Sequence, residues 1–168
     1  DRIAVSTRQA RASRGTRSSK ASVTTPICAA SRASILTGLY EREHGYTFGK
    51  PPISKDHVAS SYPIQLRDAG YHTGFYGKFG VQLEGGKRNV GTTMFDKFER
   101  LHRGPYFKKQ KDGSLRHVDE LVGDRAVDFL KTRPADKPFC LSLSFNIAHA
   151  EDGDKRPGIG HFAWPKAV

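Results

Sequence analysis

The run TPICAASRASILTG, residues 25–38, constrains this chain more than any other segment. Good helix formers, with a proline ahead of them and a glycine behind, predict a short helix over Cys28–Thr37. Cys28 then lies at the helix N-terminus, and Arg32 lies four residues later on the same face. The N-terminal amides and the guanidinium would attract an oxyanion and favour a thiolate. The spacing fits chemistry on an anion, and it fits a buried structural cysteine equally well.

The net charge of +11 is unevenly distributed along the chain. Residues 1–24 hold six Lys and Arg residues and one acidic residue, in a stretch rich in Ser, Thr and Ala without helical or strand periodicity. We expect this basic leader to be disordered or aberrant, for instance the product of a wrong reading frame, and residues 25–168 to form the folded part. Neither stacking aromatic residues nor a known binding motif accompanies the basic residues, so no nucleic-acid partner is expected.

Three further features bound the class of protein. The chain begins with Asp1 and its single methionine is Met94, which predicts a fragment or a processed product. No stretch approaches the roughly 20 apolar residues of a membrane span, and no signal peptide is recognisable, so the sequence does not give a location. Cys28 and Cys140 are too few for a disulfide framework, and Cys140, inside an apolar run, is predicted to be a core residue.

Helix and strand signals alternate after the first helix, which predicts an α/β fold with a mostly parallel sheet flanked by helices. The expected elements are a helix over 61–69, a strand over 71–76, a loop region over 80–116, a helix over 117–131 and a buried strand over 139–145. Lys78 follows the first strand and His149 follows the second. In an open parallel sheet both residues would lie at the carboxyl edge, where ligands bind.

The segment around Cys28 resembles the signature of the formylglycine-dependent sulfatases, Cys-x-Pro/Ala-Ser-Arg-x-x-x-Leu-Thr-Gly. The fixed positions are filled by Cys28, Ala30, Ser31, Arg32, Leu36, Thr37 and Gly38. The phosphate loop of protein tyrosine phosphatases also pairs a cysteine with an arginine, but its arginine stands six residues on, where this chain has Ser34. The geometry therefore excludes that second family.

Two more segments resemble sulfatase motifs in the family's order. Residues 70–78 match Gly-Tyr-x-Thr-x-x-x-Gly-Lys, whose lysine, here Lys78, binds a sulfate oxygen. Residues 145–149 match Phe-x-x-Pro/Ala-His, whose histidine, here His149, touches the sulfate and can protonate the leaving alcohol. The family often has a histidine two residues after the lysine, where this chain has Gly80, so that contact with the nucleophile is in question.

The resemblance implies part of an alkaline phosphatase-like sandwich and a specific mechanism. A separate formylglycine-generating enzyme would oxidise Cys28 to formylglycine, whose aldehyde hydrate attacks the sulfur of a sulfate monoester. Arg32 would stabilise the diol oxygens, Lys78 would offset charge on the sulfuryl group, and His149 would assist the leaving group. Cys28, Arg32, Lys78 and His149 are thus the predicted catalytic residues, with Lys78 and His149 also binding substrate.

The family's site also contains a divalent metal, most often Ca²⁺, held by oxygen ligands. Cys28 would be a ligand only as formylglycine, and the family's other ligands are missing from this chain. Asp152 and Asp154 form an acidic turn that we interpret as solvated. The chain is therefore predicted to be a sulfatase fragment with little activity alone. A sulfated small molecule or polysaccharide is the implied substrate, and the periplasm or secretion the implied location.

Two alternatives stay open at the level of sequence. A phosphonate or phosphate monoester hydrolase of the same fold shares the nucleophile loop. A non-catalytic module that binds an anion through Cys28 and Arg32 would also explain the first motif.

Overall fold

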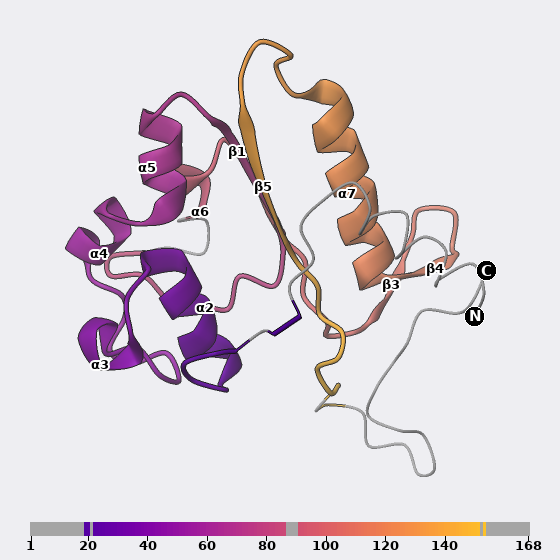
Figure 1. Cartoon of the computed structure of the whole chain (residues 1–168). Helices are drawn as coiled ribbons and strands as arrows, with labels where there is room; N and C mark the ends of the chain where they lie inside the picture. Colours follow the sequence, from indigo (N-terminus) through magenta and orange to yellow (C-terminus); the bar gives the residue numbers. More distant parts are fainter. Residues whose placement is uncertain (1–18, 21, 87–90, 152, 154–168) are drawn as a thin grey trace.

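A three-stranded parallel sheet, in the order β2-β1-β5, runs through the molecule, with α2 to α5 on one side and α7 on the other (Figure 1). The computed structural model describes residues 19–20, 22–86, 91–151 and 153. Its elements are α2 (Cys28–Thr37), α3 (Glu41–His44), α4 (Lys55–Ala59), α5 (Tyr62–Asp68), β1 (His72–Gly77), α6 (Gly91–Met94), β2 (Lys97–Arg100), β3 (Phe107–Lys109), β4 (Leu115–His117), α7 (Val118–Thr132) and β5 (Phe139–Ser144). The antiparallel pair β3-β4 stands beside the start of α7.

Helix α2 has the bounds that the sequence predicts. It begins at Cys28 and ends before Gly38, whose φ of 74° is the left-handed conformation that glycine adopts without strain. The Gly38 N–H donates to the carbonyl oxygen of Ser34 at 2.8 Å, which satisfies one of the last carbonyls of the helix. Ala33 and Leu36 are buried, so this helix packs one face inward and leaves Cys28 exposed at its N-terminus.

Strand β1 is the centre of the sheet and is buried along five of its six residues. It pairs in parallel with β5 from His72↔Phe139 to Gly77↔Ser144 and with β2 on the other side. At Gly77 the two strands approach so closely that a Cβ would overlap the Ser144 carbonyl oxygen, and only glycine fits there. The carboxyl ends of all three strands therefore meet at one edge, as the sequence predicts for Lys78 and His149.

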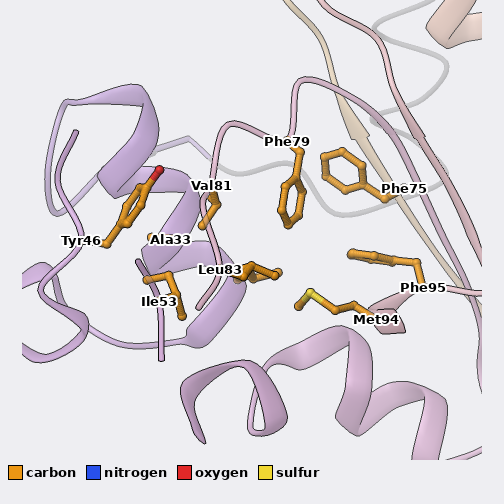
Figure 2. Close-up of a cluster of buried hydrophobic side chains, with 10 residues drawn as sticks. Ala33, Tyr46, Ile53, Phe75, Phe79, Val81, Leu83, Met94 and Phe95 are labelled. Carbon is orange, nitrogen blue, oxygen red and sulfur yellow. The ribbon is translucent and has the colours of Figure 1, made fainter. Parts of the chain in front are cut away.

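The main hydrophobic core fills the space between α2 and the sheet (Figure 2). Its buried members are Ala33, Leu36, Tyr46, Ile53, Phe75, Phe79, Val81, Leu83, Met94 and Phe95. Phe75 packs edge-on against Phe79 at 5.4 Å between ring centroids, a favoured aromatic geometry. This packing fixes the segment that follows β1, including Lys78, against helix α2.

Helix α7 covers the opposite face of the sheet, and its predicted amphipathic pattern is confirmed. The buried positions are Val118, Val122, Ala126 and Phe129, at helical spacing. Phe129 lies so close to β1 that a Cβ at Gly74 would be 2.7 Å from its ring. A second core cluster of Tyr76, Val122 and Phe129 results from this contact.

Two sequence predictions need correction. The region 80–116, predicted as loop, contains α6, β3, β4 and a strand of the main sheet, β2. Strand β2 reads Lys-Phe-Glu-Arg, so only Phe98 packs against the main core and the apolar pattern is too weak to identify a strand. The sequence predicts a buried strand over 139–145, but β5 is half-exposed because it is an edge strand of the described sheet.

Other predicted features fall partly or wholly outside the described residues. Of the basic leader, residues 1–18 and 21 lie outside, and so do Asp152 and Asp154 of the acidic turn.

Cys140 is a free thiol and is half-buried rather than a full core residue. Among the described residues, no helix combines the length and apolar character required to cross a bilayer.

Candidate active site

Lys78 directly follows the carboxyl end of β1 and lies beside the N-terminus of α2. Its backbone N–H donates to the Ser144 carbonyl oxygen at 2.8 Å, which continues the β1-β5 ladder by one residue. The residue is only 9% exposed, and its ammonium group interacts electrostatically with the Cys28 side chain. Burial lowers the pKa of the Lys78 ammonium, and the neighbouring Cys28 opposes that shift. A buried cation thus stands beside the predicted nucleophile.

Arg32 is held by the same sheet edge. Its Nη1 donates to the Lys78 carbonyl oxygen at 2.7 Å and also to the Ser144 hydroxyl, which in turn donates to that carbonyl at 2.9 Å. Burial lowers the pKa of the guanidinium, and Cys28 opposes the shift. The Arg32 Nε is buried and finds no hydrogen-bond partner among the described residues. The structure therefore brings three predicted site residues, Cys28, Arg32 and Lys78, into one cluster.

Gly80 lies directly over this cluster. Its φ is +65°, and a Cβ there would be 3.2 Å from Arg32 Cδ and 3.7 Å from Lys78 Cε. Its carbonyl oxygen accepts a hydrogen bond from the Tyr46 hydroxyl at 3.3 Å. At this position, which often carries a histidine in the family, the backbone instead passes close to Arg32 and Lys78.

His149 lies at the same edge, on the loop that follows β5. The N–H groups of Asn146 and Ile147 donate to the Asp119 carboxylate at 2.8 and 2.9 Å, and the Asn146 side-chain amide donates to it at 3.1 Å. The buried Tyr106 hydroxyl donates to the carbonyl oxygens of Asn146 and His149. Asp119, in the first turn of α7, and Tyr106 together fix the backbone of this loop.

The His149 imidazole has a defined orientation. Its Nδ1 lies 2.9 Å from the Ala150 carbonyl oxygen, which can only accept, so Nδ1 carries the proton and donates it. The second nitrogen, Nε2, is then the atom able to take up or release a proton. This hydrogen bond ties the imidazole to its own loop.

The sequence did not identify Ser144, Asp119, Tyr106 or Tyr46 as parts of this region. Ser144 is a polar residue in an otherwise apolar strand, which is a signal that could have marked it. Asp119 and Tyr106 act on this loop mainly through main-chain groups distant in sequence, and no local pattern reports such contacts.

A metal centre is not supported by the described residues. No group of three or more His, Cys, Asp or Glu side chains converges in the part of the chain that the structure describes. The residues that the structure describes therefore do not form a calcium site, which needs several oxygen ligands.

Comparison with known proteins adds an independent observation. A sequence model of the Sulfatase family matches residues 3–159. The chain belongs to the sulfatase family. Among the relatives of this sulfatase-family chain, a putative extracellular sulfatase Sulf-1 homolog from Caenorhabditis elegans is 31% identical over 88% of this chain and 23% of its own length. An N-acetylglucosamine-6-O-sulfatase from Bacteroides thetaiotaomicron is 28% identical over 71% of this chain and 22% of its own.

A solved structure supports the fold assignment. It is a complex with the substrate D-glucosamine-2-N,6-O-disulfate, is 24% identical in sequence, and matches with a TM-score of 0.58 over 78% of this chain and 27% of that one. The predicted α/β fold, with a parallel sheet flanked by helices, is confirmed. This sulfatase-family chain spans less than a quarter of the length of the two curated relatives described above.

Proposed function

We propose that this chain carries the nucleophile region of a sulfuric ester hydrolase that cleaves a sulfate monoester. The observation that supports this most is the cluster at the N-terminus of α2, where the buried Lys78 ammonium interacts electrostatically with Cys28 and Arg32 donates to the Lys78 carbonyl oxygen at 2.7 Å. Two cations beside an exposed thiol suit an anionic ester whose sulfur lies over the Cys28 position. Formylglycine at Cys28 would supply the attacking hydroxyl.

The four residues would have distinct roles. Lys78 would bind a sulfate oxygen and offset the charge that develops on the transferring group. Arg32, oriented by Ser144 and the Lys78 carbonyl, would hold the oxygens on the modified residue. His149 would give a proton from Nε2 to the departing alcohol, while its Nδ1–H stays on the Ala150 carbonyl oxygen. No step is assigned to a metal, because the described residues do not form a ligand set.

The names of the relatives indicate a substrate class and a location. One of them is called a putative extracellular sulfatase, and the other an N-acetylglucosamine-6-O-sulfatase. We therefore propose a sulfated sugar, as a small molecule or part of a polysaccharide, as the substrate, and a secreted location for the protein. The activity of this chain alone is expected to be low.

Mass spectrometry of the Cys28 peptide tests the proposal directly. After co-expression with a formylglycine-generating enzyme, the peptide should lose about 18 Da because the thiol becomes an aldehyde. The Cys140 peptide of the same digest is the matched control, since its half-buried thiol lies outside the motif and should keep its mass. A Cys28 peptide of unchanged mass would refute the formylglycine mechanism and favour a simple anion-binding module.

The choice between sulfate and phosphate esters needs a second measurement. Turnover of an aryl sulfate and of the matching aryl phosphate by the converted protein should favour the sulfate. Preference for the phosphate would instead support a phosphate or phosphonate monoester hydrolase of the same fold.

A further inference from the structure

Basic side chains gather beside the Cys28 cluster on the segment that follows β2. Arg100 ends β2, and His102 and Arg103 come next. The Leu101 N–H donates to the Gly77 carbonyl oxygen at 3.0 Å, so this segment leaves the sheet directly beside the residue that precedes Lys78. The carboxyl ends of the parallel strands β1 and β2 thereby bring two groups of basic residues to one edge of the sheet. Lys78 follows β1, and His102 and Arg103 follow β2.

Two contacts fix this segment against the His149 loop. The Arg103 Nε donates to the Ala150 carbonyl oxygen at 2.8 Å. The Tyr106 hydroxyl donates to the His149 carbonyl oxygen at 2.5 Å, and Tyr106 is only 1% exposed. The chain between these anchors cannot move away from the His149 loop without breaking these partly buried hydrogen bonds, so the course of its backbone is fixed.

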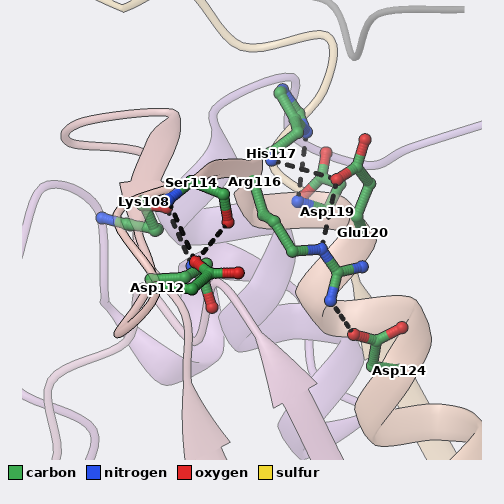
Figure 3. Close-up of polar contacts among 9 residues, drawn as sticks. Lys108, Asp112, Ser114, Arg116, His117, Asp119, Glu120 and Asp124 are labelled. Carbon is green, nitrogen blue, oxygen red and sulfur yellow. Dashed lines mark hydrogen bonds and ion pairs between the residues drawn. The ribbon is translucent and has the colours of Figure 1, made fainter.

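The hairpin of β3 and β4 contributes a further cation, Lys108. The Gln110 side chain donates to the Lys108 carbonyl oxygen at 2.8 Å, and the Ser114 backbone and hydroxyl donate to Asp112 across the turn (Figure 3). Lys108 is half-buried, whereas the next residue, Lys109, is exposed on the opposite face of the strand. The hairpin thus directs one of its two adjacent lysines toward the body of the protein.

The positive charges of this segment, of the hairpin and of Lys78 influence the protonation of His102. Burial lowers the pKa of the His102 imidazole, and so do the positive charges of four basic neighbours, Arg100, Lys108, Lys78 and Arg103. Glu151 is the acidic group that acts on Lys108, and it also accepts a hydrogen bond from the Tyr106 N–H at 3.3 Å. Lys78 is one of the basic neighbours of His102, so the charges of this segment and of the Cys28 cluster influence one another.

We propose that His102, Arg103 and Lys108 form a second anion subsite, which binds another sulfate or carboxylate group of the same substrate molecule while its ester sulfate lies at Lys78. The inference rests on the proposed function, because it takes the Cys28 cluster as the place of the reacting ester. It narrows the substrate class to sulfate esters that carry at least two negative charges.

Isothermal titration calorimetry on the unconverted chain tests this subsite without consuming ligand. The probes are glucosamine 6-sulfate and the same sugar with a second sulfate on its nitrogen. The disulfated probe should bind more tightly, and Lys108→Gln should weaken it by about three- to fivefold, as expected for a partly exposed charge contact, with the monosulfated probe unaffected. Lys109→Gln, which removes an equal charge from the adjacent exposed position, should change neither affinity.

The outcomes separate this inference from the proposed function. Equal affinity for the two probes, or equal effects of Lys108→Gln and Lys109→Gln, would overturn the second subsite even if Cys28 is converted to formylglycine. A Lys108-dependent preference for the disulfated probe, in a protein whose Cys28 peptide keeps its mass, would support the subsite and refute only the hydrolase.

Discussion

The two faces of the sheet contribute to the candidate site in different ways. On the α2 face, the predicted reacting residues form one cluster, since Lys78 interacts electrostatically with Cys28 and Arg32 donates to the Lys78 carbonyl oxygen and the Ser144 hydroxyl. On the α7 face, Asp119 holds two backbone N–H groups and the Asn146 side-chain amide of the loop that carries His149, rather than His149 itself. The first region holds the predicted reacting residues themselves. The second supports one of them, His149, by hydrogen bonds to neighbouring residues of its loop. Loss of the support should therefore affect the loop without disturbing Cys28.

The largest expected effect comes from removing the Asp119 carboxylate, which holds the His149 loop against α7. Asp119→Ala leaves the N–H groups of Asn146 and Ile147 without an acceptor, and Asn146 is 2% exposed. Losing charge-assisted hydrogen bonds to buried donors should lower the free energy of unfolding by about 3 kcal/mol. Urea unfolding measures this loss, and hydrogen exchange should localise it to the amides of the His149 loop.

Asp124→Ala is the matched control on the same helix. Asp124 pairs with Arg116 at the surface, and Figure 3 shows this pair beside the Asp119 region. A solvent-exposed pair is screened, so the free energy of unfolding should hardly change. Equal losses for the two variants would contradict a specific role for Asp119.

The next largest effect tests the direct contacts on the α2 face. Gly80→Ala places a Cβ 3.2 Å from Arg32 Cδ at a φ of +65° and should lower the free energy of unfolding by about 1–2 kcal/mol. It should also weaken binding of inorganic sulfate, because Arg32 and Lys78 must shift. Gly38→Ala has a similar φ of +74° with no atom within 4 Å, so it shares the backbone strain alone. If Gly38→Ala weakened sulfate binding equally, crowding of Arg32 would be the wrong explanation.

A smaller and opposite effect is expected from stabilising helix α7, which carries Asp119. Gly123 lies inside α7, and a Cβ added there would have no atom within 4 Å, so alanine fits. Gly123→Ala should raise the free energy of unfolding by about 0.5–1 kcal/mol, because alanine loses less backbone entropy in a helix. Thermal unfolding checks the direction, and slower exchange of the Ile147 amide would show that the gain reaches the loop. A lower melting temperature would count against the helix as described.

The smallest expected effect is a pH dependence on the α2 face. His44 is 4% exposed, its Nδ1 accepts the Tyr46 N–H at 3.0 Å, and its Nε2 lies 3.0 Å from the Ser34 hydroxyl. Burial lowers the pKa of His44, and Glu41 opposes this. The unfolded chain then binds more protons than the folded one, so stability is complete above the ordinary histidine pKa of about 6.5 and declines as pH falls below it.

His44→Asn checks the origin of that pH dependence. The Asn carbonyl can still accept the Tyr46 N–H, but the side chain does not titrate. The slope of unfolding free energy against pH between neutral and mildly acidic conditions should therefore flatten in the variant. An unchanged slope would assign the dependence to other groups.

Helices with strong local signals can be predicted from the sequence, and the weakly patterned strand cannot. The sequence predicts α2 with its observed bounds because the glycine after Thr37 and the alanines before it act locally. Helix α7 follows from apolar residues at spacings of three and four. Strand β2 escapes prediction because only Phe98 of its four residues packs against the main core, so pairing with β1 rather than apolar pattern makes it a strand.

The sequence by itself determined the family motifs, and hence Cys28, Arg32, Lys78 and His149 as the residues to examine. It also placed Lys78 and His149 at one sheet edge, because parallel strands end together. Only the tertiary structure decided that Lys78 interacts with Cys28, that Gly80 leaves room for Arg32, and that Asp119 holds the His149 loop. These contacts join residues far apart in the chain, and their geometry depends on how α2 and α7 pack on the sheet, which no local pattern encodes.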